Sequence, residues 1–485
     1  MNQIKKDTIS GAKWGMLQKL TMQPLQLVYS MVLARLISPT EMGIVGLTAI
    51  FFAIADQLAN AGFGSALIRK IDRTEDDCNT MFWFNVVMSF LVSSILFLSA
   101  PWFASFYNQP ELLWLTRASA FNMFMGSLSN VHWTLYQCRR DFKTPAIVGC
   151  ITSLVGMPVC LSLAWMGWGV WAIMCQGLCT SLLSLSIVWC ISPWKPRLLF
   201  SCSSFRYLFG FGSKLACSGL IHIVYREITT FIIGKFYSPA QLGFFSRGRH
   251  AAAIIPQTLS SILGSVTYPI LSTLQNDDEV LRRVYQKYIR ISTLVIAFGI
   301  ACVISMATPL IHVMYGATWL PCAIYLQIIA LSYSTDHVAS INLNLLMVKG
   351  RSDLFLRLEI IKKSVSLAMI FYAATISVEA ICWAGAIYAQ IAIFINTYYT
   401  GKLLGLTWWR QQKDYLPYFA QAGVACIPAY LLTTTNMPAI VQLVLGGGCA
   451  FILYFGTLHL RREAAYIELY RTLRQNKWCK WLPAI

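Results

Sequence analysis

Cationic side chains that could bind an anion occur inside long apolar stretches of this sequence. Lys19, Arg226, Arg247 and Arg249 each lie in a stretch long enough to cross a membrane as a helix. A charged side chain near the bilayer centre costs about 2.5–3.5 kcal/mol on insertion scales, so it persists mainly where it faces water, an ion pair or a ligand. Guanidinium and ammonium groups form charge-assisted hydrogen bonds with phosphates and carboxylates. We therefore predict an anion-binding site within the membrane, with Arg226 as its first candidate.

Uncharged and acidic polar residues accompany these cations at helical spacing. Lys19, Gln23 and Gln26 recur at i, i+4 and i+7, which places them on one face of a helix. Asp56 and Asn60 are four residues apart. A further set, Asp336, Ser340 and Asn344, also recurs at four-residue spacing. We expect all of these polar side chains to line one cavity.

Close neighbours on one helix point in different directions. Arg247 and Arg249 are two residues apart, so at most one of them can be central to a site. Glu227 follows Arg226 directly and is turned about 100° around the helix. We therefore expect Arg226 and Glu227 not to pair with each other.

The acidic residues Asp56, Glu227 and Asp336 admit two interpretations. As protonatable or sodium-binding carboxylates, they would couple the protein to an ion gradient. An acid in the membrane is explained equally well as the ion-pair partner of Lys19 or Arg226. Neither His132 nor His222 has a second histidine or a carboxylate four residues away, so we predict neither a metal site nor a cofactor, and we assign no catalytic residue.

The elements that carry these residues are membrane helices. The chain has 57% hydrophobic residues, 12% charged residues and a mean hydropathy of +0.58, which is typical of a polytopic membrane protein. Apolar runs of about 20 residues recur along it, the length needed to cross the bilayer. We predict an all-α protein of about fourteen such helices, at 14–36, 42–67, 80–100, 112–136, 145–165, 170–191, 208–237, 242–268, 290–315, 322–347, 358–377, 382–401, 416–434 and 439–460.

A repeat 200 positions apart divides these helices. Residues 35–43, RLISPTEMG, return as residues 235–243, KFYSPAQLG. We predict two pseudo-symmetric six-helix bundles around a central cavity, at 1–205 and 206–405, followed by two additional helices at 406–460 and a basic tail at 461–485. In membrane proteins built from parallel repeats, the binding site lies at the repeat interface, and the repeats rock around it. Transport by alternating access is therefore the first functional hypothesis.

The basic residues lie on one side of the predicted membrane. About thirty of the 38 fall in the N-terminus, in alternate connectors and in the tail, and we count Lys362 and Lys363 among the connector charges. Both termini are then cytoplasmic. The net charge of +18 is explained by contact with anionic membrane lipids, and nucleic acid is not an expected partner.

Four stretches together carry a family resemblance: residues 8–14 (TISGAKW), 32–37 (VLARLI) running into Met42 and Gly43, 62–70 (GFGSALIRK) and 242–247 (LGFFSR). The chain resembles the polysaccharide exporters of the multidrug/oligosaccharidyl-lipid/polysaccharide superfamily, and within it the colanic-acid and lipopolysaccharide type. The resemblance implies a flippase of the bacterial inner membrane that translocates an undecaprenyl-pyrophosphate-linked oligosaccharide, a repeat unit of O-antigen, capsule or exopolysaccharide. Polysaccharide polymerase machinery is the partner that would consume this cargo.

Two other classes compete with this interpretation. A multidrug cation antiporter of the same superfamily would require a cavity dominated by acids, whereas the charges inside these helices are mainly positive. A membrane glycosyltransferase or polysaccharide polymerase would require an ordered loop outside the bilayer, and the predicted periplasmic connectors are short. We therefore do not expect an enzyme. No G-x-x-x-x-G-K-[ST] sequence occurs, so the energy would come from an H+ or Na+ gradient or from consumption of the cargo.

Overall fold

The computed structural model describes residues 21–60 and 62–475, and the elements in these ranges are helices. Nine helices among the described residues are long and apolar enough to cross a membrane. The predicted all-α polytopic fold is confirmed, while the total of fourteen spans stays a prediction. A helix at residues 21–36 leads into α2 (Pro39–Asn60), α3 (Phe63–Arg69), α4 (Glu75–Phe106), α5 (Leu112–Ser127), α6 (Asn130–Cys138), α7 (Lys143–Trp165), α8 (Val170–Ile191), α9 (Cys202–Phe236) and α10 (Pro239–Thr273).

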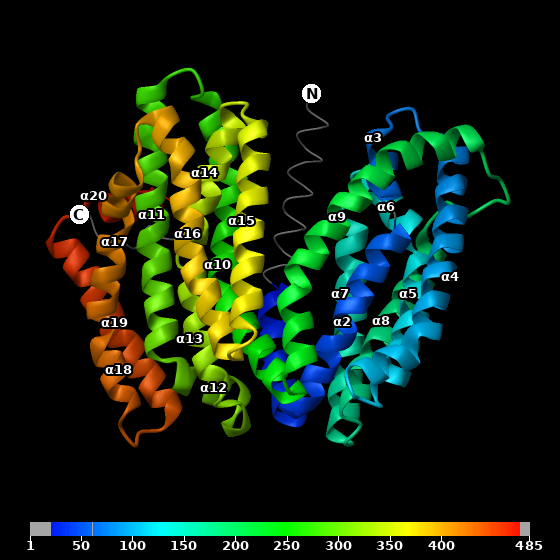
Figure 1. Cartoon of the computed structure of the whole chain (residues 1–485), viewed down its shortest axis with the longest axis horizontal. Coiled ribbons are helices and arrows are strands. Elements are labelled where there is room, and N and C mark those ends of the chain that lie inside the picture. The colour runs from blue at the N-terminus through cyan, green and yellow to red at the C-terminus, as the bar shows by residue number, and fades with distance from the viewer. Residues whose placement is uncertain (1–20, 61, 476–485) are drawn as a thin grey trace. The chain divides into compact units, whose positions relative to one another are not determined.

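The chain continues with α11 (Asp278–Ser305), α12 (Ala307–Tyr315), the 3-10 turn η1 (Ala317–Trp319), α13 (Cys322–Tyr333), α14 (Asp336–Val348), α15 (Ser352–Ala373), α16 (Val378–Leu404), α17 (Trp408–Ala425), α18 (Ile427–Thr433), α19 (Ala439–Leu460) and α20 (Ala464–Gln475). The helices gather into two compact units, residues 1–243 and 244–485, which we call unit 1 and unit 2. Helix α9 packs with α2, α3 and α4 inside unit 1 (Figure 1). The units divide the chain later than position 205, and the duplication boundary there stays a prediction from the sequence.

Five of the predicted spans are broken into shorter helices. The first break separates α2 from α3 at Gly62, whose φ of 70° is in the left-handed region that favours glycine. A Cβ at this position would lie 2.4 Å from the backbone oxygen of Gly212 on α9. Glycine is therefore required here both by the turn and by the close approach of α9. The other four breaks lie between α5 and α6, between α11 and α12, between α13 and α14, and between α17 and α18.

The repeated Ser-Pro segment starts α2 and α10 in the same way. The backbone N–H of Ser38 donates to Glu41 Oε2 at 2.7 Å, and the N–H of Glu41 donates to Ser38 Oγ at 3.3 Å. Ser238 and Gln241 form the corresponding two bonds, each 3.3 Å long. Each copy is thus a capping box with proline at the first helical position. The repeat in the sequence is a repeated signal for the start of a helix.

The two repeated helix starts contact each other within unit 1. A Cβ on Gly43 would lie 1.8 Å from the backbone oxygen of Pro239, and a Cβ on Gly243 would lie 2.0 Å from the backbone oxygen of Pro39. Both obstacles are backbone atoms, which cannot rotate away. The glycines therefore allow two backbones to pack more closely than any other residue would permit.

Unit 2 is organised around α11, which packs with α13, α17 and α20. Arg290 on α11 donates from Nε and Nη2 to Asp414 Oδ1 on α17 at 2.9 and 2.6 Å. Gln286 donates to the other carboxylate oxygen at 2.8 Å, and the Asp414 side chain is only 4% exposed. A buried carboxylate with this many donors is well compensated. The ion pair joins α17, the first of the additional helices, to α11.

We predict that Gly43→Ala destabilises the folded chain by about 1–3 kcal/mol, because the added methyl group overlaps backbone that must shift. The measurement is the thermal unfolding midpoint of the purified protein in detergent, which we expect to fall. Gly448→Ala on α19 is the matched control, since no atom lies within 4 Å of the position its Cβ would take. An unchanged midpoint for Gly43→Ala would show that the close approach does not constrain the fold.

Candidate functional site

A line of polar side chains runs along the exposed face of α9 in unit 1. Lys214, Ser218, His222 and Arg226 recur at four-residue intervals, and all four are exposed. Successive members are turned by about 40°, so they form a slowly winding line that extends about 18 Å along the helix. We call these four residues the α9 polar line. It places two permanent cations, a histidine and a hydroxyl on one surface of a membrane helix.

Arg226 forms an ion pair with Glu227, contrary to the expectation from their angular separation. Arg226 Nε lies 2.8 Å from Glu227 Oε1, and the other carboxylate oxygen accepts from Thr230 Oγ1 at 3.4 Å. The expectation was wrong because both side chains are long enough to bend toward each other across 100° of helix. Arg226 nevertheless stays 50% exposed, whereas Glu227 is 21% exposed. The pair fixes the guanidinium in position and leaves much of it accessible to a ligand.

The structure describes all but one of the polar residues predicted on the first two helices. Lys19 lies outside the described residues, while Gln23 and Gln26 are exposed on the helix at 21–36. Asp56 and Asn60 are half-buried on α2, and Asn60 accepts a hydrogen bond from Asn130 of α6. Asp56 forms no ion pair with Arg226 or with any other residue that the structure describes.

Helix α2 also contacts the helix that carries the polar line. Gln57 donates a hydrogen bond to the backbone oxygen of Ala216 at 3.4 Å. Asp56 directly precedes Gln57 on α2, and α2 packs directly against α9.

In unit 2, Arg247 and Arg249 contact different neighbours. The Arg247 guanidinium lies 5.7 Å from the ring centroid of Tyr315 and 6.0 Å from that of Trp319. Arg249 lies beside Tyr333 at the end of α13. Arg247 is thereby held against aromatic rings, which is an anchoring role. Arg249 is the better of the two candidates for a ligand contact.

Helix α14 separates its polar residues onto two faces. Asp336 and Ser340 are exposed and Asn344 is half-buried, so the predicted polar stripe faces out of unit 2. On the opposite face, buried Asn342 accepts from Thr400 at 2.6 Å and donates to Gln411 at 3.0 Å. The inner residue Asn342 is satisfied by protein partners, and a cavity role for the outer stripe stays a prediction.

Two charged residues of α15 were assigned incorrectly from the sequence. Lys362 and Lys363 were counted with the connector charges, but both lie within α15, and the Lys362 side chain is 8% exposed. Glu359 binds Lys362 at 2.5 Å and lies 3.9 Å from Lys363. Their spacing at i+3 and i+4 from Glu359 was the available signal, because a buried lysine requires a nearby carboxylate.

Charged side chains also gather outside the α9 polar line. No group of three or more His, Cys, Asp or Glu side chains that could hold a metal ion occurs in the described ranges.

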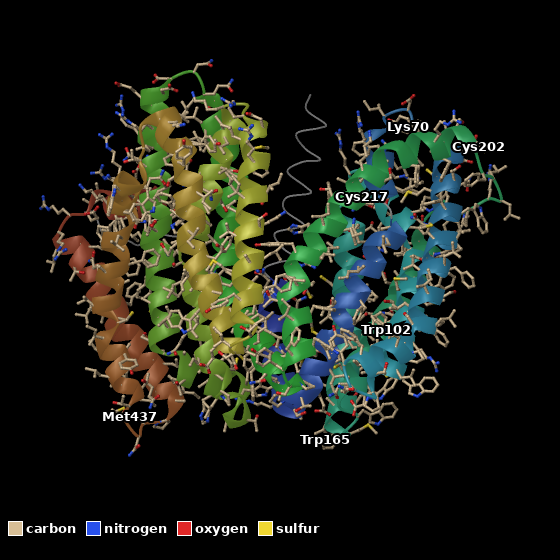
Figure 2. The ribbon with its side chains drawn as sticks, viewed as in Figure 1. Lys70, Trp102, Trp165, Cys202, Cys217 and Met437 are labelled. Carbon is tan, nitrogen blue, oxygen red and sulfur yellow. The ribbon has the colours of Figure 1, made fainter. Side chains whose placement is uncertain are left out.

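The basic connectors of unit 1 lie at the end marked by Lys70 and Cys202, opposite Trp102 and Trp165 (Figure 2). We call the Lys70 end the basic end of unit 1. At this end the carboxylate of Asp77 raises the pKa of Lys70 through a hydrogen bond of 2.7 Å.

Comparison with known proteins finds a family match and several relatives. A family model described as "Polysaccharide biosynthesis protein" matches residues 32–324. The succinoglycan biosynthesis transport protein ExoT of Rhizobium meliloti (strain 1021) is 22% identical over 480 residues, which cover 96% of this chain and 95% of that protein. The lipopolysaccharide biosynthesis protein WzxC of Escherichia coli (strain K12) is 21% identical, with coverage of 74% and 73%. The teichuronic acid biosynthesis protein TuaB of Bacillus subtilis (strain 168) is 24% identical, with coverage of 73% and 74%.

Solved structures with the same fold include two membrane transport proteins. The lipid II flippase MurJ in an inward closed conformation matches with a TM-score of 0.71 and 12% identity, over 93% of this chain and 99% of that one. An inward-facing multidrug resistance transporter of the MATE family matches with a TM-score of 0.61 and 14% identity, over 80% and 94%. These likenesses establish the fold.

We predict that the α9 polar line faces water within the membrane. In a version of the chain without native cysteines, Ser218→Cys and His222→Cys should react with a charged, membrane-impermeant thiol reagent. The matched control is Ile452→Cys on α19, which is also exposed but lies on an apolar helix and should not react. Equal protection of all three positions would show that the line faces lipid.

Proposed function

Because this chain belongs to the polysaccharide biosynthesis protein family, we propose that it moves a lipid-linked glycan from one leaflet of a bacterial membrane to the other. The observation that carries this proposal is the α9 polar line with its half-exposed Arg226. The cargo we assign is an undecaprenyl-pyrophosphate-linked oligosaccharide, the repeat unit of an O-antigen, capsule or exopolysaccharide. The chain is a transport protein rather than an enzyme, since ExoT is named as a transport protein and both matched structures are of transporters.

The chemistry of the cargo fits the position of the cations. A diphosphate must cross about 30 Å of hydrocarbon while its lipid tail stays among the acyl chains. Fixed guanidinium and ammonium groups replace the lost hydration with charge-assisted hydrogen bonds. The α9 polar line offers such groups over about 18 Å of helix, more than half of that distance. Lys19, Arg247 and Arg249 are further candidates for contact with the anionic headgroup.

The competing functions are less well supported by the same surface. A multidrug cation antiporter shares this fold with the MATE transporter, but its cargo would be repelled by a line that carries Lys214 and Arg226. A polymerase or glycosyltransferase would place its reactive groups in an ordered loop outside the membrane. The polar residues on which this proposal depends, those of the α9 polar line, lie within a helix instead.

The mechanism we propose is alternating access driven by a gradient or by removal of the product. Both termini and the basic end of unit 1 face the cytoplasm, in agreement with the distribution of Lys and Arg. Asp56 on α2 is the first candidate for coupling to H+ or Na+, and Asp336 on α14 is the second. Consumption of the glycan by polymerase machinery on the far side would pull the cargo in the same direction.

Arg226→Gln should reduce transport at least tenfold, because a hydrogen bond to a charged group contributes about 1.5–3 kcal/mol. The measurement is recovery of surface polysaccharide in a deletion strain, with lipid-linked intermediates assayed on each face of the membrane. Arg283→Gln is the matched control, since Arg283 is exposed and paired only with Glu279 one turn away. Retained transport by Arg226→Gln would remove this residue from the proposed site.

A double variant separates ligand binding from simple charge balance. If Arg226 serves only to neutralise Glu227, the neutral pair Arg226→Gln/Glu227→Gln should restore transport. If Arg226 binds the anionic cargo, the double variant should stay as inactive as Arg226→Gln. Restoration by the second substitution would therefore argue against the proposed role.

Asp56→Asn should abolish the dependence of transport on an imposed pH or sodium gradient if Asp56 is the coupling group. The measurement uses proteoliposomes with a defined gradient and a fluorescent lipid-linked oligosaccharide. Unchanged gradient dependence in Asp56→Asn would eliminate coupling through that carboxylate while leaving the assignment of the cargo intact.

A further inference from the structure

We propose that unit 1 contains a phosphate-binding pocket at its basic end, separate from the α9 polar line. A cavity of about 280 Å³ lies between the start of α4, the end of α6 and the segment 192–201. No residue of α9 lines it. The lining residues are Arg73, Thr74, Glu75, Cys78, Leu135, Cys138, Arg139 and Trp194.

The pocket carries two cations that no described carboxylate neutralises. Arg73 and Arg139 form no ion pair with the residues that the structure describes. The one acid in the lining, Glu75, is engaged by Arg197 at 3.1 Å. Two guanidinium groups beside a neutralised acid give the cavity a net positive charge, which favours an anionic occupant.

One of these guanidinium groups has a buried donor without an acceptor. Arg73 contacts the Cys138 thiol, but its Nη1 is buried and has no hydrogen-bond partner. A buried N–H without an acceptor is unfavourable, so an anion that supplies an oxygen there would be stabilised. Arginine matches the geometry of phosphate oxygens with its planar set of donors. This atom distinguishes the pocket from an ordinary cluster of basic residues.

Trp194, the aromatic residue that lines the pocket, is held in place by two neighbouring rings. The Trp194 ring lies 5.9 Å from Phe82 and 5.3 Å from His132, measured between ring centroids. His132 is buried and contacts Ser192 Oγ at 2.9 Å. A fixed indole beside two arginines presents an apolar surface next to a cationic one. That combination suits a phosphate ester, whose carbon chain packs on the ring while its oxygens contact the guanidinium groups.

The phosphate can come from an anionic membrane lipid or from solution, and binding experiments distinguish the two sources. The full-length protein in detergent is titrated with phosphatidylglycerol and analysed by native mass spectrometry, with and without millimolar inorganic phosphate. Arg73→Gln/Arg139→Gln should weaken lipid binding at least tenfold. The matched control, Arg140→Gln/Arg206→Gln, removes the same charge from exposed positions outside the pocket and should change binding by less than twofold.

Displacement of phosphatidylglycerol by inorganic phosphate supports the pocket with a lipid as its occupant. Binding of inorganic phosphate alone, lost only in the pocket variant, supports the pocket with a soluble occupant. Equal lipid and phosphate binding by the two double variants overturns the proposal. If the glutamine variant unfolds at a lower temperature, Arg73→Lys/Arg139→Lys provides the test, because it keeps the charge and should bind with intermediate affinity. The binding result tests the pocket whether or not these variants still transport, so the failure of this proposal is distinguishable from failure of the proposed function.

Discussion

The absence of water from the bilayer core is the constraint on which this structure depends. Backbone groups there must bond internally, and the described elements accordingly are helices. Most polar side chains inside the helical units also bond to other protein groups, although some do not. Asp414 is surrounded by donors from Arg290 and Gln286, and Lys362 is held by Glu359. Such groups are satisfied within one unit and need nothing from outside it.

Against that background, polar groups that face out of their unit are informative. The α9 polar line lies on a helix long enough to cross a membrane, and the outer stripe of α14 lies on a shorter helix of 13 residues. Neither is enclosed by its own unit as Asn342 and Asp414 are. Lipid would leave them unsatisfied at a high cost in free energy. This cost is the physical basis for proposing that these surfaces face water or a hydrophilic cargo. The pairing of Arg226 with Glu227 is consistent with this view, because it orients a cation without burying it.

Much of this could be predicted from the sequence, because hydrophobic length and charge distribution determine membrane helices directly. The repeat, the helical class and the shared face of Asp336, Ser340 and Asn344 all follow from spacing, whereas the cavity that this face was expected to line stays a prediction. Breaks such as the one at Gly62 depend on the approach of α9, which spacing does not reveal. The Arg226–Glu227 pair depends on side-chain reach rather than on helical angle. The orphaned donor of Arg73 depends on contacts among three segments that are distant in sequence.

The contact between the two Ser-Pro helix starts is reciprocal. Gly43 approaches the backbone of Pro239, and Gly243 approaches the backbone of Pro39. Each Ser-Pro segment therefore has two roles, because it begins its own helix and also forms the surface against which the glycine of the other segment packs. A substitution in either segment would accordingly disturb the start of both helices.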